Sequence, residues 1–262
     1  MELRGKVVVV TGAARGIGRA LATRFASEGA EAVILADVDG RGAIAAARDI
    51  GPSASAIECN VAHEDDVARL VYQVEKTHGR IDAVCSNAGV AIGGGPEAAN
   101  DEWQRIWEVN VMAHVYIARH VLPGMLARKD GYIVGTVSAA GLLNHVFAAP
   151  YGVTKAAALS FFEWLAIAHG DDGIRVSCLC PQGVKTAMLL GESERAGTSF
   201  LLDGALEPED VAEAVVKGIA AERFLILPHP EVADYFRRKA DDYDRWLRGM
   251  RRLRANLASP AR

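Results

Sequence analysis

The chain has 262 residues, of which 24% are charged and 50% apolar, and its formal net charge is −4. A chain of this length and composition buries a full core, which excludes disordered proteins, collagen-like repeats and disulfide scaffolds. No apolar stretch reaches the roughly 20 residues of a membrane-spanning helix, and the four-valine run near the start is too short for a signal peptide. We therefore expect a cytoplasmic protein whose partners include neither a membrane nor, given its slight acidity, nucleic acid.

The four cysteines lie in or beside short apolar segments, at Cys59, Cys85, Cys178 and Cys180. None of them has a metal-ligand spacing such as Cys-x-x-Cys. We predict reduced, buried thiols and no metal site.

Short β-branched segments alternate with longer helical patterns along nearly the whole chain. The predicted strands are residues 6–11, 32–36, 55–59, 81–86, 131–137, 174–180 and 224–227. Between the first two, Ile17, Leu21 and Phe25 recur every four residues, as in an amphipathic helix. The pattern predicts an α/β fold: a Rossmann-like, doubly wound, seven-stranded parallel sheet with helices on both faces. No repeat or linker divides the chain, so residues 1–262 form one predicted domain.

The first predicted strand runs directly into the turn TGAARGIG at residues 11–18, which opens a helix. Glycines there allow a tight turn and let a pyrophosphate approach the helix amino terminus, where free N–H groups favour anions. A glycine turn alone is equally consistent with tight packing. Here the strand before it, the helix after it and Asp37 at the end of the second strand favour a dinucleotide.

Asp37 also indicates which dinucleotide is bound. Its carboxylate can accept hydrogen bonds from a ribose diol, whereas a 2′-phosphate would bring two negative charges together. Arg15 is opposing evidence, because a cation in the turn could reach a 2′-phosphate, but the residue is equally consistent with a solvated charge. Val38 stands where a second basic residue would help NADP, so NAD is the predicted cofactor and NADP the less favoured one.

A Tyr-x-x-x-Lys spacing places a phenol and an ammonium one helical turn apart, where the cation favours phenolate and suits tyrosine to acid/base chemistry. The spacing occurs three times, at Tyr72/Lys76, Tyr151/Lys155 and Tyr235/Lys239. Thirteen residues upstream, only the second copy has a hydroxyl, Ser138, just past a predicted strand. A hydroxyl and a phenol can converge there on one carbonyl.

These residues resemble the short-chain dehydrogenase/reductase family, in its shorter single-domain branch, over nearly the whole chain. The resemblance rests on TGAARGIG at 11–18, SNAG at 86–89, EVN ending at Asn110, Ser138 and YGVTK at 151–155. It implies hydride transfer with Tyr151 as general acid/base, Lys155 lowering its pKa and binding the nicotinamide ribose, and Ser138 holding the substrate oxygen. Asn110 would anchor a water in a proton relay; taken alone, it would more often be a structural residue of a long helix.

The motifs and the resemblance together give a predicted cofactor site. It consists of Gly12, Arg15, Gly16, Ile17, Gly18, Asp37, Asn60, Val61, Asn87, Ala88, Gly89, Tyr151, Lys155, Pro181, Val184 and Thr186. The sequence departs from the family at three positions. Asn60 replaces the usual Asp beside the adenine, Ser86 replaces an Asn, and Gln182 replaces a Gly.

The predicted substrate contacts are Ser138, His145, Tyr151, Gln182 and Met188. Gln182 either donates to a substrate oxygen or faces outward, and His145 is either a proton carrier or a structural loop residue. Residues 187–206, apolar at both ends, correspond to a mobile lid in the family and suit an apolar substrate. No carboxylate or arginine is evidently placed to bind an anionic substrate.

From residue 231 onward, nine Lys or Arg stand against five Asp or Glu. Apolar residues recur at helical spacing there, so we predict an amphipathic carboxyl-terminal helix with a solvated basic face rather than a nucleic-acid site. The apolar helix at 158–168 indicates a further buried surface, and family members commonly form dimers or tetramers through it. The expected protein is an NAD-dependent oxidoreductase of apolar secondary alcohols and their ketones, as a homodimer or homotetramer. The alternative is a non-catalytic NAD(H) sensor or scaffold.

Overall fold

The computed structural model describes residues 1–192 and 201–258. Its seven strands form one sheet in the order β3-β2-β1-β4-β5-β6-β7, and every neighbouring pair is parallel. The strands are β1 (Val7–Thr11), β2 (Ala32–Asp37), β3 (Ala54–Glu58), β4 (Ala83–Ser86), β5 (Gly131–Thr136), β6 (Ile174–Leu179) and β7 (Leu225–Ile226). The prediction of a doubly wound, seven-stranded parallel sheet is confirmed, with strand ends that differ by one or two residues.

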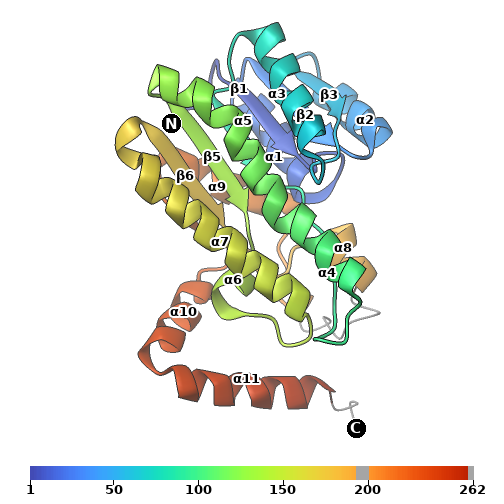
Figure 1. Ribbon diagram of the computed structural model, residues 1–262, viewed down its shortest axis with the longest axis vertical. Helices are drawn as coiled ribbons and strands as arrows, with labels where there is room; N and C mark the ends of the chain where they lie inside the picture. Colours follow the sequence, from blue (N-terminus) through green and yellow to red (C-terminus); the bar gives the residue numbers. More distant parts are fainter. Residues whose placement is uncertain (193–200, 259–262) are drawn as a thin grey trace.

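Helices cover both faces of the sheet (Figure 1). They are α1 (Gly16–Ser27), α2 (Gly40–Ile50), α3 (Glu64–His78), α4 (Asn100–Trp107), α5 (Ala113–Arg128), α6 (Ala139–Leu143), α7 (Ala149–His169), α8 (Ala187–Glu192), α9 (Pro208–Ala220), α10 (Glu231–Asp241) and α11 (Tyr243–Ala258). A π-helix, η1 (Glu108–Met112), joins α4 to α5, and a 3-10 turn, η2 (Gly170–Asp172), follows α7.

Two apolar cores lie on opposite faces of the sheet because successive side chains of a strand point to opposite sides. In β1, Val7 and Val9 belong to the core beneath α3, α5 and α7. Val8 and Val10 belong to the core beneath α1, α2 and α9. All four valines are at most 1% exposed. A strand buried on both faces needs an unbroken apolar run, which is what the sequence shows there.

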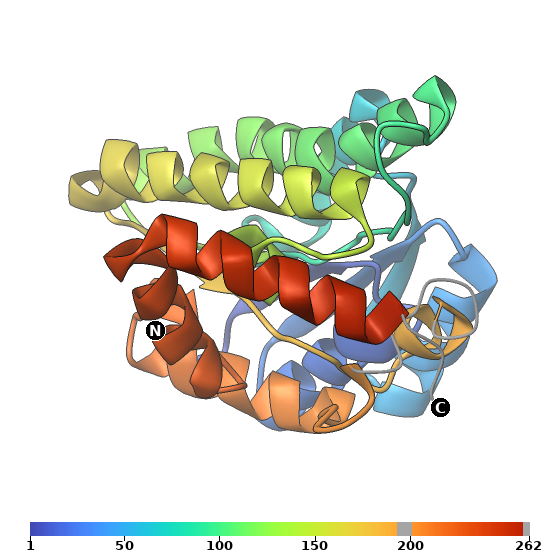
Figure 2. The ribbon, with the colours of Figure 1, turned by 90° about the horizontal axis from the view of Figure 1, so that it is seen from below.

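The carboxyl-terminal region differs from the single helix predicted from residue 231. It forms two helices, α10 and α11, which meet at Asp242 (Figure 2). Asp242 is extended (φ −151°, ψ 93°), and its Oδ1 accepts a hydrogen bond of 2.9 Å from the backbone N–H of Arg245. The residue therefore ends one helix and caps the start of the next. Val232 of α10 is fully buried in the core beneath α3, α5 and α7, whereas α11 has no buried residue.

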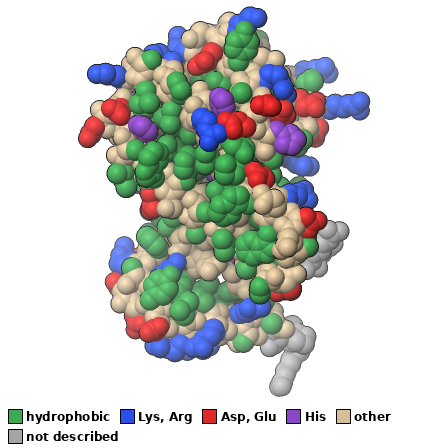
Figure 3. Space-filling view, viewed as in Figure 1, with side chains coloured by type: hydrophobic (Ala, Val, Ile, Leu, Met, Phe, Trp, Pro, Cys, Tyr) green, Lys and Arg blue, Asp and Glu red, His purple; other side chains and the backbone are tan. Residues whose placement is uncertain are grey.

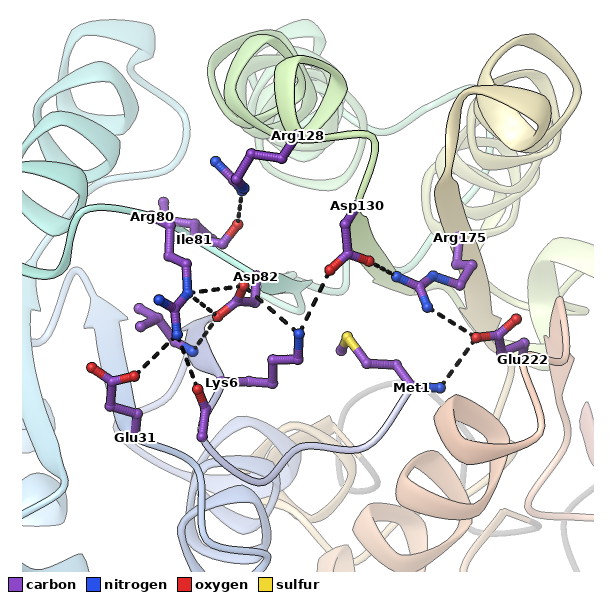
Figure 4. Close-up of polar contacts among 12 residues, drawn as sticks. Met1, Lys6, Glu31, Arg80, Ile81, Asp82, Arg128, Asp130, Arg175 and Glu222 are labelled. Atoms are coloured by element: carbon purple, nitrogen blue, oxygen red, sulfur yellow. Dashed lines mark hydrogen bonds and ion pairs between the residues drawn. The ribbon is translucent and has the colours of Figure 1, made fainter.

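The amino ends of the strands carry a network of charged side chains (Figure 4). At its centre Asp82 is buried, and it accepts hydrogen bonds from the backbone N–H of Val7 at 2.8 Å and from Nε of Arg80 at 2.9 Å. Arg175 bridges Asp130 and Glu222 across the neighbouring strands. This edge ties the sheet together and leaves the opposite edge for ligands.

The four cysteines are buried and unbridged, as predicted. Burial raises the pKa of the Cys59 and Cys180 thiols to about 12, so both stay protonated near neutral pH. Among the described residues, no helix is long and apolar enough to cross a membrane. Within the same residues, no group of three or more His, Cys, Asp or Glu side chains is arranged to hold a metal ion.

Candidate active site

One cleft of about 1240 Å³ runs along the carboxyl edge of the sheet. It begins at the glycine turn between β1 and α1, passes the ends of β4 and β5, and ends beneath α10 and α11. Strand order reverses beside β1, which pairs with β2 on one side and β4 on the other. Ligands of doubly wound sheets bind at such a reversal. Of the predicted site residues, all but Asn110 line this cleft.

The glycine turn is shaped to receive a phosphate. Gly12 and Gly16 have φ values of +65° and +56°, in the left-handed region that glycine adopts without strain. A Cβ at Gly18 would overlap the carbonyl oxygen of Gly12, so helix and turn pack closer than any side chain allows. The first N–H groups of α1 have no intrahelical partner, and Arg15 caps the helix without a side-chain hydrogen bond. The turn thus fits a pyrophosphate at the start of α1.

Asp37 supports this turn directly. Its Oδ2 accepts a hydrogen bond of 2.9 Å from the backbone N–H of Ala14, and its Oδ1 accepts one of 2.9 Å from the N–H of Asp39. The carboxylate lines the cleft beside Val38, which is 67% exposed. Because a carboxylate oxygen can accept two hydrogen bonds and each oxygen of Asp37 accepts one here, capacity remains for a ribose diol. Sequence reasoning gave Asp37 a ligand role but missed its role in the turn.

Asn87 links three strand ends at the middle of the cleft. Its Nδ2 donates to the carbonyl oxygen of Thr11 at 2.9 Å, and its Oδ1 accepts from the hydroxyl of Thr136 at 3.0 Å. The Thr11 hydroxyl accepts in return from the Asn87 N–H at 2.9 Å. The ends of β1, β4 and β5 are therefore fixed before any ligand arrives. Beside Asn87, the hydroxyl of Ser86 forms a hydrogen bond of 2.7 Å with Nδ1 of the buried His114.

Ser138, Tyr151 and Lys155 all line the cleft, and Ser138 follows the end of β5. Ser138 caps α6, with its Oγ accepting from the N–H of Ala140 at 3.1 Å. Tyr151 lies in the first turn of α7, and Nζ of Lys155 is 5.7 Å from the centroid of its ring. The structure therefore places all three residues on one cleft, and the convergence of the Ser138 hydroxyl and the Tyr151 phenol on one carbonyl stays a prediction.

Lys155 is 3% exposed, and its Nζ donates to the carbonyl oxygen of Thr136 at 3.0 Å. Burial lowers the pKa of Lys155 from 10.5 to about 8, because the charged form is poorly solvated there. Sequence reasoning missed the Thr136 carbonyl, since a backbone acceptor has no residue signature. The neighbouring His114 has its pKa lowered to about 3 by burial and by the Lys155 charge, so it stays neutral.

Asn110 lies in the π-helix η1 and is fully buried behind the cleft wall. Its Oδ1 accepts from the N–H of Val90 at 2.9 Å, and its Nδ2 donates to the Val90 carbonyl at 2.9 Å and to the Thr154 hydroxyl at 3.3 Å. Asn110 therefore holds the chain after β4 against α7, the helix that carries Tyr151. Asn110 is thus tied to Val90 and Thr154, and its expected part in a proton relay stays a prediction.

The predicted substrate residues differ in how they are held. The ring of His145 meets that of Tyr151 edge-on at 6.2 Å, and its Nδ1 accepts from the N–H of Phe147 at 3.2 Å. Burial lowers the pKa of His145. Gln182 lines the cleft, but its Nε2 donates to Glu231 at 2.9 Å, which ties the loop after β6 to the start of α10. Neither of the two roles considered for Gln182 included this tether.

The predicted lid is described only at its ends. Met188 lies in α8 and lines the cleft with 40% exposure. Thr186 packs close to Gly16, where an added Cβ would lie 3.2 Å from its Cγ2. Residues 193–200, including Phe200, lie outside the described part of the chain.

The sequence indicated no arginine evidently placed to bind an anionic substrate, yet four arginines outside the glycine turn line the cleft. Arg105 of α4, Arg238 of α10 and two arginines of α11, Arg245 and Arg252, all line the cleft. The spacing of 245 and 252 by seven residues places them on one helical face, and this signal was available in the sequence. What was missing was the path of the helix over the cleft.

Comparison with known proteins gives the family. The family model described as short chain dehydrogenase matches residues 6–196. Meso-2,3-butanediol dehydrogenase of Serratia marcescens is 37% identical over 229 residues, covering 85% of this chain and 90% of that protein. 1-deoxy-11-beta-hydroxypentalenate dehydrogenase of Streptomyces exfoliatus is 35% identical over 254 residues, covering 92% of this chain and 90% of that protein.

A solved structure shows the same architecture. The short chain dehydrogenase/reductase from Burkholderia phymatum, crystallised in complex with NAD, is similar with a TM-score of 0.86 and 30% identity. The match covers 93% of this chain and 96% of that chain. The glycine turn, the Ser138, Tyr151 and Lys155 cluster and these similarities lead to one conclusion: the chain belongs to the short chain dehydrogenase family and is an oxidoreductase.

Proposed function

We propose that the protein interconverts an apolar secondary alcohol and its ketone with NAD as cofactor and Tyr151 as general acid/base. The observation that carries the proposal is that Ser138, Tyr151 and Lys155 line the same cleft as the glycine turn. The butanediol dehydrogenase relative supports an alcohol as substrate. When bound, the nicotinamide supplies or accepts the hydride, and the protein positions the substrate and moves the proton.

Each side chain has a distinct task in this proposal. The Tyr151 phenol gives a proton to the carbonyl oxygen in reduction and removes one from the hydroxyl in oxidation. The Ser138 hydroxyl holds the same oxygen. The Lys155 ammonium, excluded from water and close to the Tyr151 ring, favours phenolate and so brings the phenol within reach of neutral pH. Asn110 is a positioning residue that holds α7 in place through Thr154.

The test replaces Tyr151 by Phe and follows nicotinamide absorbance with a panel of secondary alcohols of increasing apolar size. Turnover should fall at least about a thousandfold, within the reach of a lost acid/base and its charge stabilisation, while NADH affinity stays within about twofold. Tyr72→Phe is the matched control, because Tyr72 has the same spacing to a lysine but is 62% exposed and does not line the cleft. Near wild-type turnover in Tyr151→Phe would refute the assignment. NADH binding without turnover of any alcohol would favour the alternative function, a non-catalytic NAD(H) sensor or scaffold.

NAD is proposed over NADP because Asp37 lines the cleft and its charge would repel a 2′-phosphate. The similar Burkholderia structure was solved in complex with NAD. Arg15 also lines the cleft, so the comparison must be direct. Parallel titration with NADH and NADPH should give at least about tenfold tighter NADH binding. Equal or tighter NADPH binding would overturn this part of the proposal.

We also propose a cytoplasmic homodimer or homotetramer. The support is an outward apolar face on α4 and α7, where Trp107, Val153, Trp164 and Ile167 are 38%, 46%, 57% and 83% exposed. Large apolar side chains gathered on one face of a helix usually mark an interface. Light scattering at micromolar concentration should give a multiple of 27.9 kDa, and a monomeric mass would contradict this.

A further inference from the structure

The far end of the cleft is built by the carboxyl-terminal helices rather than by the sheet. Ten of the residues that line the cleft belong to the segment from Tyr235 to Leu253. In Figures 1 and 2, α11 crosses the end of the molecule beneath α7. Its lining residues are Arg245, Trp246, Gly249, Met250, Arg252 and Leu253, which recur at helical spacing and define the inner face of α11.

The inner face is divided between two kinds of side chain. Along one side lie Arg245 and Arg252, two helical turns apart, and along the other lie Trp246, Met250 and Leu253. Between them Gly249 leaves open space, since an added Cβ would meet nothing within 4 Å. Figure 3, in the orientation of Figure 1, shows both basic and hydrophobic side chains at the end of the molecule where α11 lies. An apolar strip beside a row of guanidinium groups matches an amphiphile rather than a purely apolar molecule.

The charges on the inner face are available for a ligand. Within residues 1–192 and 201–258, neither Arg245 nor Arg252 forms an ion pair. Asp241 and Asp242 also line the cleft, at the junction of α10 and α11, and Asp242 caps α11. Arg252 lies ten residues after Asp242, about 15 Å from that junction at 1.5 Å per residue. The positive end of the inner face is therefore the end remote from the acids.

The helix is held in place by α10 and its tethers. The Gln182 to Glu231 hydrogen bond fixes the start of α10, and Nζ of Lys239 donates to the carbonyl oxygen of Leu142 at 2.6 Å. On α11 itself, the guanidinium carbon of Arg254 lies 5.8 Å from the ring centroid of Phe147, a residue of the loop between α6 and α7. These contacts keep the inner face over the same cleft that holds Tyr151, although no residue of α11 is buried.

We propose that the inner face of α11 recognises the far end of the substrate and selects secondary alcohols or ketones whose apolar body ends in a carboxylate. This inference rests on the proposed oxidoreductase function and refines its substrate class. The apolar strip receives the chain, and Arg252, with Arg245 beside it, pairs with the carboxylate in the planar geometry that guanidinium favours. The chemical step is unchanged: hydride transfer at one end of the molecule, ion pairing at the other.

The test compares straight-chain methyl ketones that carry a terminal carboxylate with their methyl esters, over a range of lengths. In the double variant Arg245→Gln/Arg252→Gln, kcat/KM for the best carboxylate should fall at least about tenfold, while that for its ester stays within about twofold. Arg251→Gln is the matched control, one residue away on the same helix but outside the cleft lining. Equal losses for acid and ester, or no loss in the double variant, would overturn the proposal.

A second variant probes the open space. Gly249→Leu should lower kcat/KM at least about fivefold for the long ketones, acid and ester alike, and leave butanone unchanged, because the added side chain fills the inner face without reaching the reacting end. If the long ketones are turned over as before, the inner face does not contact the substrate and the proposal fails.

A binding measurement separates this inference from the proposed function. Fatty carboxylates without the ketone group are titrated by calorimetry into the protein saturated with NADH. Binding that weakens at least about tenfold in the Arg245→Gln/Arg252→Gln variant supports the inference even if no alcohol is turned over. Turnover of ketones without such binding refutes the inference and leaves the oxidoreductase proposal intact. If the double variant instead lowers the mass in sedimentation and spares carboxylate binding, α11 contacts a second copy and the inference is wrong.

Discussion

Replacing Lys155 by Met should make the cofactor-free protein more stable near neutral pH, because the buried charge opposes folding. The pKa of Lys155 falls by about 2.5, from 10.5 to about 8. At about 1.4 kcal/mol for each pKa unit, this corresponds to about 3 kcal/mol. Methionine fills similar volume but leaves the carbonyl oxygen of Thr136 without its donor, which costs about 1 kcal/mol. The expected net gain at pH 7 is about 2 kcal/mol.

The gain has a defined dependence on pH. The unfolded chain keeps the Lys155 proton up to about pH 10.5, whereas the folded chain releases it near pH 8. Between these values the unfolded state binds more protons, so the free energy of unfolding of the wild type rises with pH. The destabilisation caused by the buried Lys155 charge therefore disappears. At pH 10.5 the Met variant should be the less stable by about 1 kcal/mol, which is the cost of the unpaired carbonyl.

Urea unfolding followed by circular dichroism, from pH 7 to pH 10.5, measures this difference. Other groups that titrate in the window do so in both proteins and cancel. Lys76→Met is the control, because Lys76 has the same spacing to a tyrosine but is exposed. A Lys155→Met variant that is less stable than the wild type at pH 7, or a difference that does not change with pH, would refute the reasoning.

Three further outcomes are expected. Gly18→Ala should weaken NADH binding at least about tenfold and lower the midpoint of thermal unfolding, since its Cβ would overlap the carbonyl of Gly12; unchanged NADH affinity would contradict the tight turn. Asp82→Ala should cost about 3 kcal/mol in urea unfolding, against under about 1 kcal/mol for the more exposed Asp130→Ala, and equal costs would contradict the role of burial. Trp164→Glu should halve the mass found by light scattering without unfolding the chain, and an unchanged mass would exclude this face as the interface.

The sheet was predictable because strands buried on both faces leave an unmistakable signal. The valine run of β1 and the alternation of strands with helices specify a parallel sheet without knowledge of distant contacts. Ser138 and Tyr151 could also be placed from the sequence, since one follows strand β5 and the other lies near the start of α7, the helix that leads to β6. Short-range patterns are sufficient where the fold itself places residues at a fixed edge.

The remaining features depend on contacts that are distant in sequence. Asn110 falls in an apolar helical segment, and only the packing of Val90 and Thr154 around it shows that it stays behind the cleft wall. The path of α11 follows from the burial of Val232 and the extended backbone at Asp242, neither of which the helical pattern of residues 231–258 reveals. Consequently the arginines of α11 were recognised as a basic face but not as part of the site.

The two backbone hydrogen bonds of Asp37 have a consequence for protein engineering. An exchange of Asp37 for a small neutral residue, made to accept NADPH, would remove the acceptor for the N–H of Ala14 together with the negative charge. The glycine turn would then lose a support in the same step that changes the preference, and affinity for both dinucleotides would suffer. A redesign toward NADPH must supply a new acceptor for the N–H of Ala14 as well as a cation for the phosphate, because one carboxylate serves both the turn and the strand end.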